Sequence, residues 1–529
     1  MIFGRTNAKI IKKNIICNTN TIVILISITV IGFILRAIFT PWEIVMPSSD
    51  SIIFFREAYN FSNGEFGEIS RRVLWPLIIS FVFIFFKSDN ISHYVDIMQI
   101  ISIFISSITI PVVYFFTKHF VVRKYAFISA GLFAIEPNII NNSTFTLTEP
   151  LFIFLGILSL YFVLKFNFKG IIIGVIFMGL ALDVRLNAIV LPFIFVLILI
   201  FKIRPKNEIF KSMIIGMPIL FLLISPYYIS ELNNENSNFG STLTSFTTYN
   251  EKEISPHLYN FDKTILMKLG IIENTSPLDD LGKMTTGDVY WLAFLKELIH
   301  VIRVLIPFLI FMVPFGLYCI SKKPNFQKKI LVITMILYFI ILLPQYTISA
   351  ELRNLLFLIP IFCVISTIFL ENKIEKFRLH NIILVIILII CVSSSIVFLY
   401  QDKQDIELTL EKELFGKFVA DNYNGRIMGD LSQYIEYNLI QLDEIPIKQS
   451  EKIQIINPFF VISTYDNLEK YLNDNKISYV IIDDSLNNRY PMFEDIFSHE
   501  EKYPKLEKVF DSQNEFEFLK VKIFKIDLE

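Results

Sequence analysis

Long runs of apolar residues recur along the first 400 residues of this 529-residue chain, and they constrain its fold more than any other feature. The first run, Thr21 to Thr40, has about the twenty residues that an α-helix needs to cross the hydrocarbon core of a bilayer. Further runs lie near 93–117, 124–140, 149–166, 170–184, 187–202, 209–229, 299–320, 329–347, 354–370 and 381–400. The sequence therefore predicts a polytopic α-helical membrane protein with about eleven transmembrane helices.

The composition supports a chain that folds in lipid. Hydrophobic residues make up 53% of the chain and charged residues only 19%, and the mean hydropathy is +0.55. The formal net charge of −2 gives no reason to expect a nucleic acid as partner. The cysteines form no CxxC pair, so the sequence indicates neither a disulfide framework nor a zinc site. They are Cys17, Cys319, Cys363 and Cys391.

Lysine and arginine residues gather in alternate loops between the apolar runs. Basic residues also precede the first run, and no small-residue cleavage site follows it, so we expect a retained helix after a cytoplasmic tail of residues 1–20. Since cytoplasmic loops are enriched in Lys and Arg, the basic loops lie on the same side as the N-terminus of a multi-pass plasma-membrane protein. Those loops contain Lys118, Arg123 and Lys124; Lys165 and Lys169; Lys202, Arg204 and Lys206; Lys322, Lys323, Lys328 and Lys329; Lys373, Lys376 and Arg378.

Three segments stand apart from the spans of the predicted transmembrane domain, residues 21–400. Residues 41–92 form a predicted outer loop, in which Val73–Phe86 is too short to cross the membrane and is expected to lie along it. Residues 230–298 form a second outer loop. Residues 401–529 are predicted to be a small soluble α/β domain outside the cytoplasm. Its expected strands are Phe459–Ser463, Tyr479–Ile482 and Phe516–Ile526, with a helix at Asn467–Asn473.

Ionisable side chains in or beside apolar runs are costly in lipid and therefore mark candidate functional positions. They are Arg36, Glu136, Glu149, Asp183, Arg185, Arg303 and Arg353. Under the predicted topology most of them converge on the outer half of the membrane, where loop 41–92 carries Asp50. The sequence predicts a functional centre on that side.

Each of the main candidates also has a purely structural interpretation. Asp50 follows a Pro-Ser-Ser segment and suits a turn or a helix N-cap. Glu149, between Thr148 and Pro150, suits the first turn of a helix that Thr148 caps. Arg185 fits a snorkelling side chain, and Arg353 fits a loop arginine. The chemistry of the single residues leaves both interpretations open.

Six short motifs occur in a fixed order between about residues 20 and 400. The first places Asp50, Phe54, Ala58 and Gly64 in the first outer loop, with Ser51 directly after the acid. The others are Leu74-Trp-Pro-Leu, Thr148-Glu-Pro-Leu, Gly179-Leu-Ala-Leu-Asp-Val-Arg185, Pro226-Tyr-Tyr-Ile and Leu352-Arg-Asn-Leu-Leu-Phe-Leu-Ile-Pro360. This series resembles the GT-C superfamily of membrane glycosyltransferases, in the branch of protein O-mannosyltransferases and aminoarabinose transferases of lipid A. Ser51 stands where many members carry a second acid, and Asn354 replaces a tyrosine.

The resemblance implies an enzyme that moves a sugar, with inversion, from a polyprenyl-phosphate carrier to a hydroxyl of a protein, lipid or glycan on the outer face. It makes Asp50 the general base, with Glu149 as a second catalytic acid that orients the acceptor or tunes Asp50. Arg185 and Arg353 are the implied phosphate-binding residues. No cofactor is required; a metal is not demanded, because the sequence has no DxD motif, and the use of a divalent metal stays open.

Two other classes of protein fit a membrane cavity lined with charged groups. A transporter or flippase of lipid-linked sugars should show two related halves, and the sequence has no such internal symmetry. A non-catalytic membrane scaffold would tolerate replacement of both acids. The sequence names neither the sugar nor the acceptor.

Overall fold

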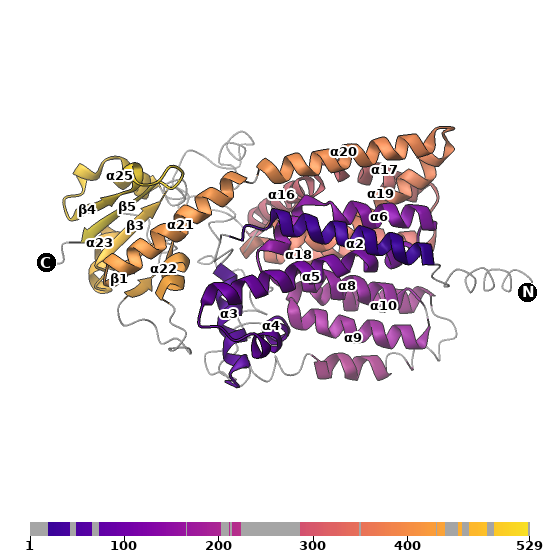
Figure 1. Ribbon diagram of the computed structural model, residues 1–529, viewed down its shortest axis with the longest axis horizontal. Helices are drawn as coiled ribbons and strands as arrows, with labels where there is room; N and C mark the ends of the chain where they lie inside the picture. The colour runs from indigo at the N-terminus through magenta and orange to yellow at the C-terminus, as the bar shows by residue number, and fades with distance from the viewer. Residues whose placement is uncertain are drawn as a thin grey trace, which may run out of the picture.

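The structure, a computed structural model, describes residues 19–42, 49–65, 73–165, 167–202, 211, 214–223, 286–348, 351–401, 403–429, 431–439, 453–456, 465–483 and 491–526. These residues form a bundle of helices and, beyond one end of it, a sheet with its own helices (Figure 1). The two parts follow each other along the chain, and the long helix α20 (His380–Gln401) leads from the bundle toward the sheet (Figure 1).

The helices of the bundle follow the apolar runs of the sequence. Its N-terminal half contains α2 (Thr19–Phe39), α3 (Ser49–Ser62), α4 (Leu74–Phe85), α5 (Ile91–Thr117), α6 (Arg123–Ala134), α7 (Pro137–Thr144), α8 (Glu149–Val163), α9 (Phe168–Val184), η1 (Leu186–Ile189) and α10 (Val190–Lys202). Its C-terminal half contains α16 (Thr286–Leu305), α17 (Leu309–Lys322), α18 (Phe326–Ile348), η2 (Leu352–Leu358), α19 (Ile359–Lys373), η3 (Ile374–Lys376) and α20 (His380–Gln401). A further apolar helix covers Ile214–Leu223.

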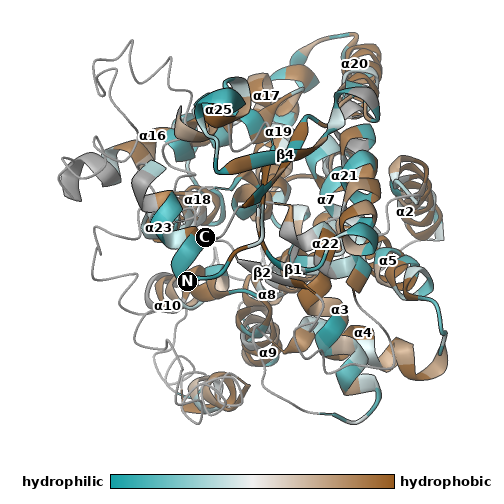
Figure 2. Ribbon diagram, turned by 90° about the vertical axis from the view of Figure 1, so that its left-hand side faces the viewer, coloured by the Kyte–Doolittle hydropathy of each residue, from teal (hydrophilic) through white to brown (hydrophobic). Residues whose placement is uncertain are grey.

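Five helical segments of the described chain are long and apolar enough to cross a membrane, and a bent pair gives a sixth. They differ in where their apolar surface lies. The segment Leu352–Lys376 is buried in the bundle, whereas α2 and α20 expose most of their apolar side chains, as helices that contact lipid do. Figure 2 shows α2 and α20 as hydrophobic ribbons at the rim of the molecule. The other predicted spans fall on shorter helices of the described chain, so the total of about eleven stays a prediction.

Two predicted spans are not straight helices. The run 299–320 divides into α16 and α17, which meet at an angle of 105°. Pro307 lies at this break and cannot donate the hydrogen bond that a continuous helix needs. The run 124–140 divides at Pro137, where the side chain of Glu136 accepts a hydrogen bond of 2.7 Å from the amide of Ile139 and so begins α7. The prediction of one continuous helix is wrong in both places.

Helices α17 and α19 approach each other closely at Gly316. A Cβ atom at this position would lie 2.2 Å from the carbonyl oxygen of Ile365, which neither helix can avoid without moving its backbone. We expect Gly316→Ala to reduce the free energy of unfolding by about 1–3 kcal/mol, the usual cost of overpacking. Thermal unfolding in detergent measures this change. The matched control is Gly131→Ala in α6, where a Cβ would meet nothing within 4 Å, and equal melting temperatures of the two variants would contradict the expectation.

The C-terminal part is a five-stranded sheet in the order β2-β1-β3-β5-β4, with helices on both faces. Strand β1 is parallel to β2 and β3, and β5 is antiparallel to β3 and β4. The elements are α21 (Lys403–Asn422), β1 (Gly425–Met428), α22 (Ser432–Leu439), β2 (Ile453–Ile456), α23 (Tyr465–Asp474), β3 (Tyr479–Asp483), α25 (Pro491–Ser498), η5 (Glu500–Lys502), β4 (Leu506–Asp511), η6 (Ser512–Asn514) and β5 (Val521–Ile526).

The expected elements of this part coincide only partly with the observed ones. Strand β3 covers the expected strand Tyr479–Ile482, and α23 contains the expected helix Asn467–Asn473. The expected strand Phe516–Ile526 is too long, because β5 begins only at Val521. The expected strand Phe459–Ser463 lies outside the described residues. Side chains of β3 alternate between two hydrophobic clusters, with Val480 in one and Ile481 in the other, as in a sheet covered on both faces.

The sheet part and the bundle touch at α3. Helix α22 contacts α3, and Tyr437 of α22 packs against the hydrophobic core of the bundle. Figure 1 shows α3 and α4 at the end of the bundle that faces the sheet. The C-terminal part therefore lies beside the element that carries Asp50.

Candidate active site

The candidate residues occupy the ends of four separate elements. Asp50 lies in the first turn of α3, and Glu149 is the first residue of α8. Arg185 follows the last residue of α9, and Arg353 lies in the 3₁₀-helix η2. Side chains at the ends of different helices can point toward a common space beyond those ends, so several of these side chains can meet at one point.

All four side chains meet in one cluster of ion pairs. Nη1 of Arg353 lies 2.8 Å from Oδ2 of Asp50, and its Nε lies 3.8 Å from Oε1 of Glu149. Arg185 donates a short hydrogen bond from Nη1 to the same oxygen of Glu149. Arg353 also pairs with Glu351. Arg353 thus joins the two acids that the sequence analysis selected, and Glu149 is held between the two arginines.

Burial varies across the cluster. The side chain of Glu149 is 2% exposed and that of Arg185 16%, whereas Asp50 and Arg353 are 15% and 28% exposed. A carboxylate as buried as that of Glu149 needs a cation beside it, because an unpaired charge in such a place is strongly destabilising. The Asp50–Arg353 side of the cluster is the more accessible one. A substrate that enters the site from the protein surface would therefore meet Asp50 and Arg353 first.

A second set of side chains holds Arg185 in place. Nη2 of Arg185 donates a hydrogen bond of 2.7 Å to Oδ1 of Asn354. The hydroxyl of Tyr338 donates to the carbonyl oxygen of Asn354 at 2.6 Å, and Tyr338 is fully buried. Sequence analysis missed both contributions: Asn354 was noted only as a departure from a tyrosine, and Tyr338 lies inside an apolar run without any distinguishing pattern.

Thr148 occupies the N-cap position of α8, and Glu149 and Pro150 lie in the first turn, as the structural interpretation expects. Thr148 precedes α8, but its side chain makes no capping hydrogen bond and instead accepts one of 3.2 Å from Nη1 of Arg185. Asp50 does lie in a first helical turn, where the helix dipole favours a carboxylate. Its ion pair with Arg353 adds an interaction that a surface cap does not need. Arg353 is not a free loop arginine either, since it pairs with three carboxylates.

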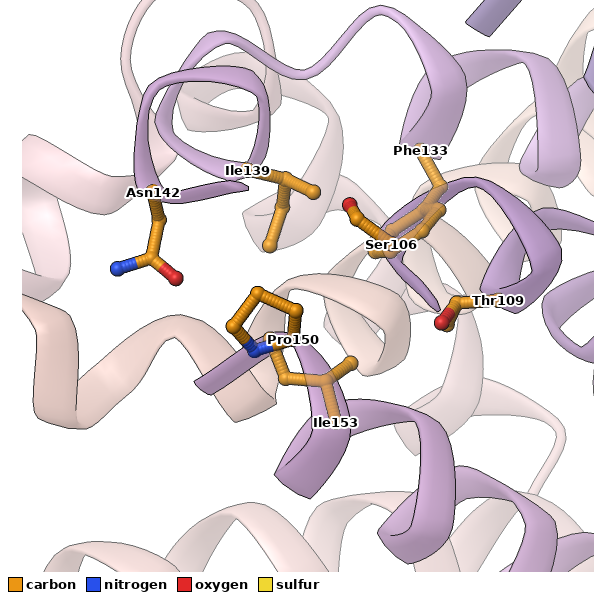
Figure 3. Close-up of a pocket in the computed structure, with 7 residues that line it drawn as sticks. All are labelled: Ser106, Thr109, Phe133, Ile139, Asn142, Pro150 and Ile153. Carbon is orange, nitrogen blue, oxygen red and sulfur yellow. The ribbon is translucent and has the colours of Figure 1, made fainter. Parts of the chain in front are cut away.

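Two further buried ionisable residues, Arg36 and Glu136, bind groups elsewhere in the bundle. Arg36 donates to Oγ of Ser106 at 2.8 Å and to the carbonyl oxygen of Ala134 at 3.1 Å. The carbonyl of Ala134 lies at the end of α6, so Arg36 gives it a hydrogen-bond donor at the break between α6 and α7. Glu136 is the N-cap of α7 at the same break. A small pocket lies beside these residues and is lined by Ser106, Thr109, Phe133, Ile139, Asn142, Pro150 and Ile153 (Figure 3). Arg36 and Glu136 therefore shape the bundle around α6 and α7.

The described residues contain no group of three or more His, Cys, Asp or Glu side chains that could hold a metal ion. The candidate cluster instead combines carboxylates with guanidinium groups. Such a combination can bind a phosphate through the arginines and can accept a proton at a carboxylate.

Comparison with known proteins gives both a family match and related folds. The family model of dolichyl-phosphate-mannose-protein mannosyltransferase matches residues 79–229, a segment that includes Glu149 and Arg185. A comparison with the curated proteins finds no match.

Among solved structures, the oligosaccharyltransferase of Archaeoglobus fulgidus with zinc and sulfate has a TM-score of 0.56 at 14% identity, covering 87% of this chain and 67% of that one. The same enzyme, AglB, with an inhibitory peptide and a dolichol-phosphate has a TM-score of 0.54 at 12% identity, covering 86% and 69%.

ArnT from Cupriavidus metallidurans bound to undecaprenyl phosphate has a TM-score of 0.50 at 10% identity, covering 96% of this chain and 98% of that one. At these identities the likeness shows the fold alone, and the family model matches one segment of the chain. The resemblance found in the sequence is therefore confirmed. Residues 79–229 match the family model of dolichyl-phosphate-mannose-protein mannosyltransferase and the chain has a GT-C-like fold, and together these findings indicate a glycosyltransferase.

Proposed function

We propose that this enzyme transfers a sugar from a polyprenyl-phosphate carrier to an acceptor hydroxyl on the outer face of the membrane, with inversion at the anomeric carbon. The observation that carries the proposal is the contact of Arg353 with both Asp50 and Glu149. In the proposal Arg353 is the phosphate-binding group and Asp50 the proton acceptor, and their contact supports this assignment. An inverting transfer from a sugar phosphate needs both groups in one place.

In the proposed reaction Asp50 takes the proton of the acceptor hydroxyl. The acceptor oxygen forms a bond with the anomeric carbon while the bond from that carbon to the phosphate oxygen breaks. Arg185 and Arg353 stabilise the negative charge that collects on the departing phosphate, because a guanidinium group can donate two parallel hydrogen bonds to phosphate oxygens. Glu149 keeps Arg185 in position and orients the acceptor. Every charge that develops in this step has a partner within the cluster.

The ion pair between Arg353 and Asp50 gives the proposed reaction an order. Arg353 lies 2.8 Å from the carboxylate that accepts the proton in this proposal. The phosphate of the donor competes for the same guanidinium and so releases Asp50 for the acceptor. The base would then become available mainly when the donor is bound.

The relatives support a lipid-linked donor. AglB was seen with a dolichol-phosphate and an inhibitory peptide, and ArnT with undecaprenyl phosphate. We infer that the polyprenyl tail of the donor lies among the apolar helices and that the acceptor is a protein, lipid or glycan. Incubating the purified enzyme with a panel of polyprenyl-phosphate monosaccharides and measuring which one loses its sugar tests the donor class. No release from any of them would contradict the proposal.

The proposed orientation places the N-terminus in the cytoplasm and both α3 and residues 401–529 on the outer side. In a variant without the native cysteines, single cysteines at Asn63 and Glu501 should react with an impermeant reagent added to intact cells, and one at Lys323 should not. All three positions are exposed on the protein surface, so membrane sidedness decides the result. Labelling of the cysteine at Lys323 in intact cells would contradict the proposed orientation.

A further inference from the structure

The connection between α7 and α8 has an unusual backbone conformation directly before Glu149. Thr146 has a φ of +54°, and it is fully buried. Left-handed backbone is unfavourable for a β-branched residue and costs roughly 1–2 kcal/mol. Such a conformation persists only where the surrounding contacts enforce it. The contacts of Thr146 therefore identify what fixes this connection.

Three hydrogen bonds join this connection to α3 and α4. The hydroxyl of Thr146 donates to Oγ of Ser51 at 2.7 Å, and the hydroxyl of Ser51 donates to the carbonyl oxygen of Phe145 at 2.8 Å. Nε1 of Trp75 donates to the carbonyl oxygen of Thr146 at 3.1 Å. Ser51, Thr146 and Trp75 are all buried. We call these three residues the latch.

The latch lies next to both acids of the cluster in the sequence. Ser51 follows Asp50 directly, and Thr146 precedes Glu149 by three residues. Arg353 contacts both acids, but it is a long side chain that also pairs with Glu351. The Arg353 side chain can therefore move with the two acids and does not by itself fix their separation. The backbone of α3 and of the connection must be held by something more rigid, and short buried hydrogen bonds meet that need.

The latch also gives a local reason for the serine at position 51, where the resembling family often has a second acid. The hydroxyl of Ser51 accepts a hydrogen bond from Thr146 and donates one to the carbonyl of Phe145. An ionised carboxylate can only accept, so it would leave the carbonyl of Phe145 facing a negative charge. A hydroxyl satisfies both partners.

We propose that Ser51, Thr146 and Trp75 are positioning residues, which set the separation of Asp50 and Glu149 by fixing α3 against the start of α8. This inference rests on the proposed function and concerns geometry at the same site. Small displacements of catalytic groups reduce turnover steeply, by up to about a hundredfold for 1 Å. Loss of the latch should therefore lower kcat more than it lowers donor binding.

The test compares variants that remove one hydroxyl at a time. Ser51→Ala and Thr146→Val each remove a latch hydroxyl, and Thr146→Ser keeps it. Ser159→Ala is the matched control, because Ser159 is a fully buried serine of α8 whose hydroxyl donates a single hydrogen bond of 2.9 Å to the carbonyl of Gly174. Asp50→Asn is assayed in parallel. kcat, KM for the polyprenyl-phosphate sugar and melting temperature are measured for each.

We expect Ser51→Ala and Thr146→Val to lower kcat at least tenfold with KM for the donor changed less than threefold, and the double variant to be no worse than either single one. Thr146→Ser and Ser159→Ala should keep kcat near wild type. The latch proposal is overturned if Ser51→Ala and Thr146→Val both keep the wild-type kcat while Asp50→Asn is inactive. It is also overturned if their loss of kcat equals that of Ser159→Ala at the same melting temperature. Full activity of Asp50→Asn would instead count against the proposed function.

Discussion

Asp50→Asn should give a protein that inserts and melts like the wild type yet turns over about two to four orders of magnitude more slowly, because a positioned general base contributes that much to rate. Asparagine keeps the shape of the side chain and its preference for the first turn of a helix. It cannot accept the proton of the acceptor hydroxyl. The substitution therefore separates catalysis from capping, and initial rates at saturating donor and acceptor measure the difference.

Glu149→Gln is the companion variant, and we expect a smaller loss of rate from it. Glu149 is not the proton acceptor in the proposed reaction, but it holds Arg185 through a short hydrogen bond. Near wild-type turnover by a well-folded Asp50→Asn enzyme would return Asp50 to the role of a turn residue and would remove the proposed base.

Arg185→Gln should reduce both stability and turnover. The side chain of Glu149 is 2% exposed, and loss of its closest cation leaves a buried charge without an adequate partner. Breaking a buried ion pair in this way costs about 3–5 kcal/mol. The loss of a phosphate-binding guanidinium lowers turnover in addition, by roughly a hundredfold or more if one preorganised donor is removed. Thermal unfolding and rate measurements on the same preparation report the two effects.

A second substitution separates the two effects of Arg185→Gln. Glu149→Gln combined with Arg185→Gln removes both charges, so we expect it to recover most of the lost stability and to stay inactive. Arg378→Gln, in an exposed arginine next to η3, controls for the change in net charge and should leave both properties unchanged. An Arg185→Gln protein with wild-type stability and rate would show that the pair is dispensable.

The sequence analysis described residues 41–92 as a loop and did not predict helix α3, although its pattern is local. Asp50, Phe54 and Ala58 are four residues apart, which places them on one face of a helix, and Phe54 and Ala58 are indeed buried. Gly64 follows the end of α3 with a φ of +82°, a conformation that glycine adopts without cost. The spacing thus reflects how α3 packs as well as where its acid lies.

The contacts between the site residues were not readable from the sequence. Asp50 and Arg353 are 303 positions apart, and no local pattern encodes their ion pair. The resemblance indicated that both residues belong to one site, but it did not indicate that Arg353 joins the two acids. Asn354 and Tyr338 were missed because they act through Arg185 and the backbone of η2 rather than through a recognisable motif.

The errors in the predicted spans have a common physical origin. A hydropathy window averages over about nineteen residues and does not register a single proline inside an apolar run. Pro137 and Pro307 each interrupt such a run, and the helices break there. A proline alone does not identify such a break, because Pro111, Pro314 and Pro344 lie inside continuous helices. The sheet of the C-terminal part was harder to predict, since its strands are four to six residues long and pair across the whole of that part.

The most direct test of the account is the fate of the sugar on a polyprenyl-phosphate donor. The purified enzyme, in lipid vesicles with a labelled polyprenyl-phosphate monosaccharide and an acceptor, should release polyprenyl phosphate in proportion to acceptor, and the new glycosidic bond should have the inverted anomeric configuration. Asp50→Asn protein should show almost no release. A product with retained configuration, or equal release by wild-type and Asp50→Asn protein, would contradict transfer by direct displacement with Asp50 as the base.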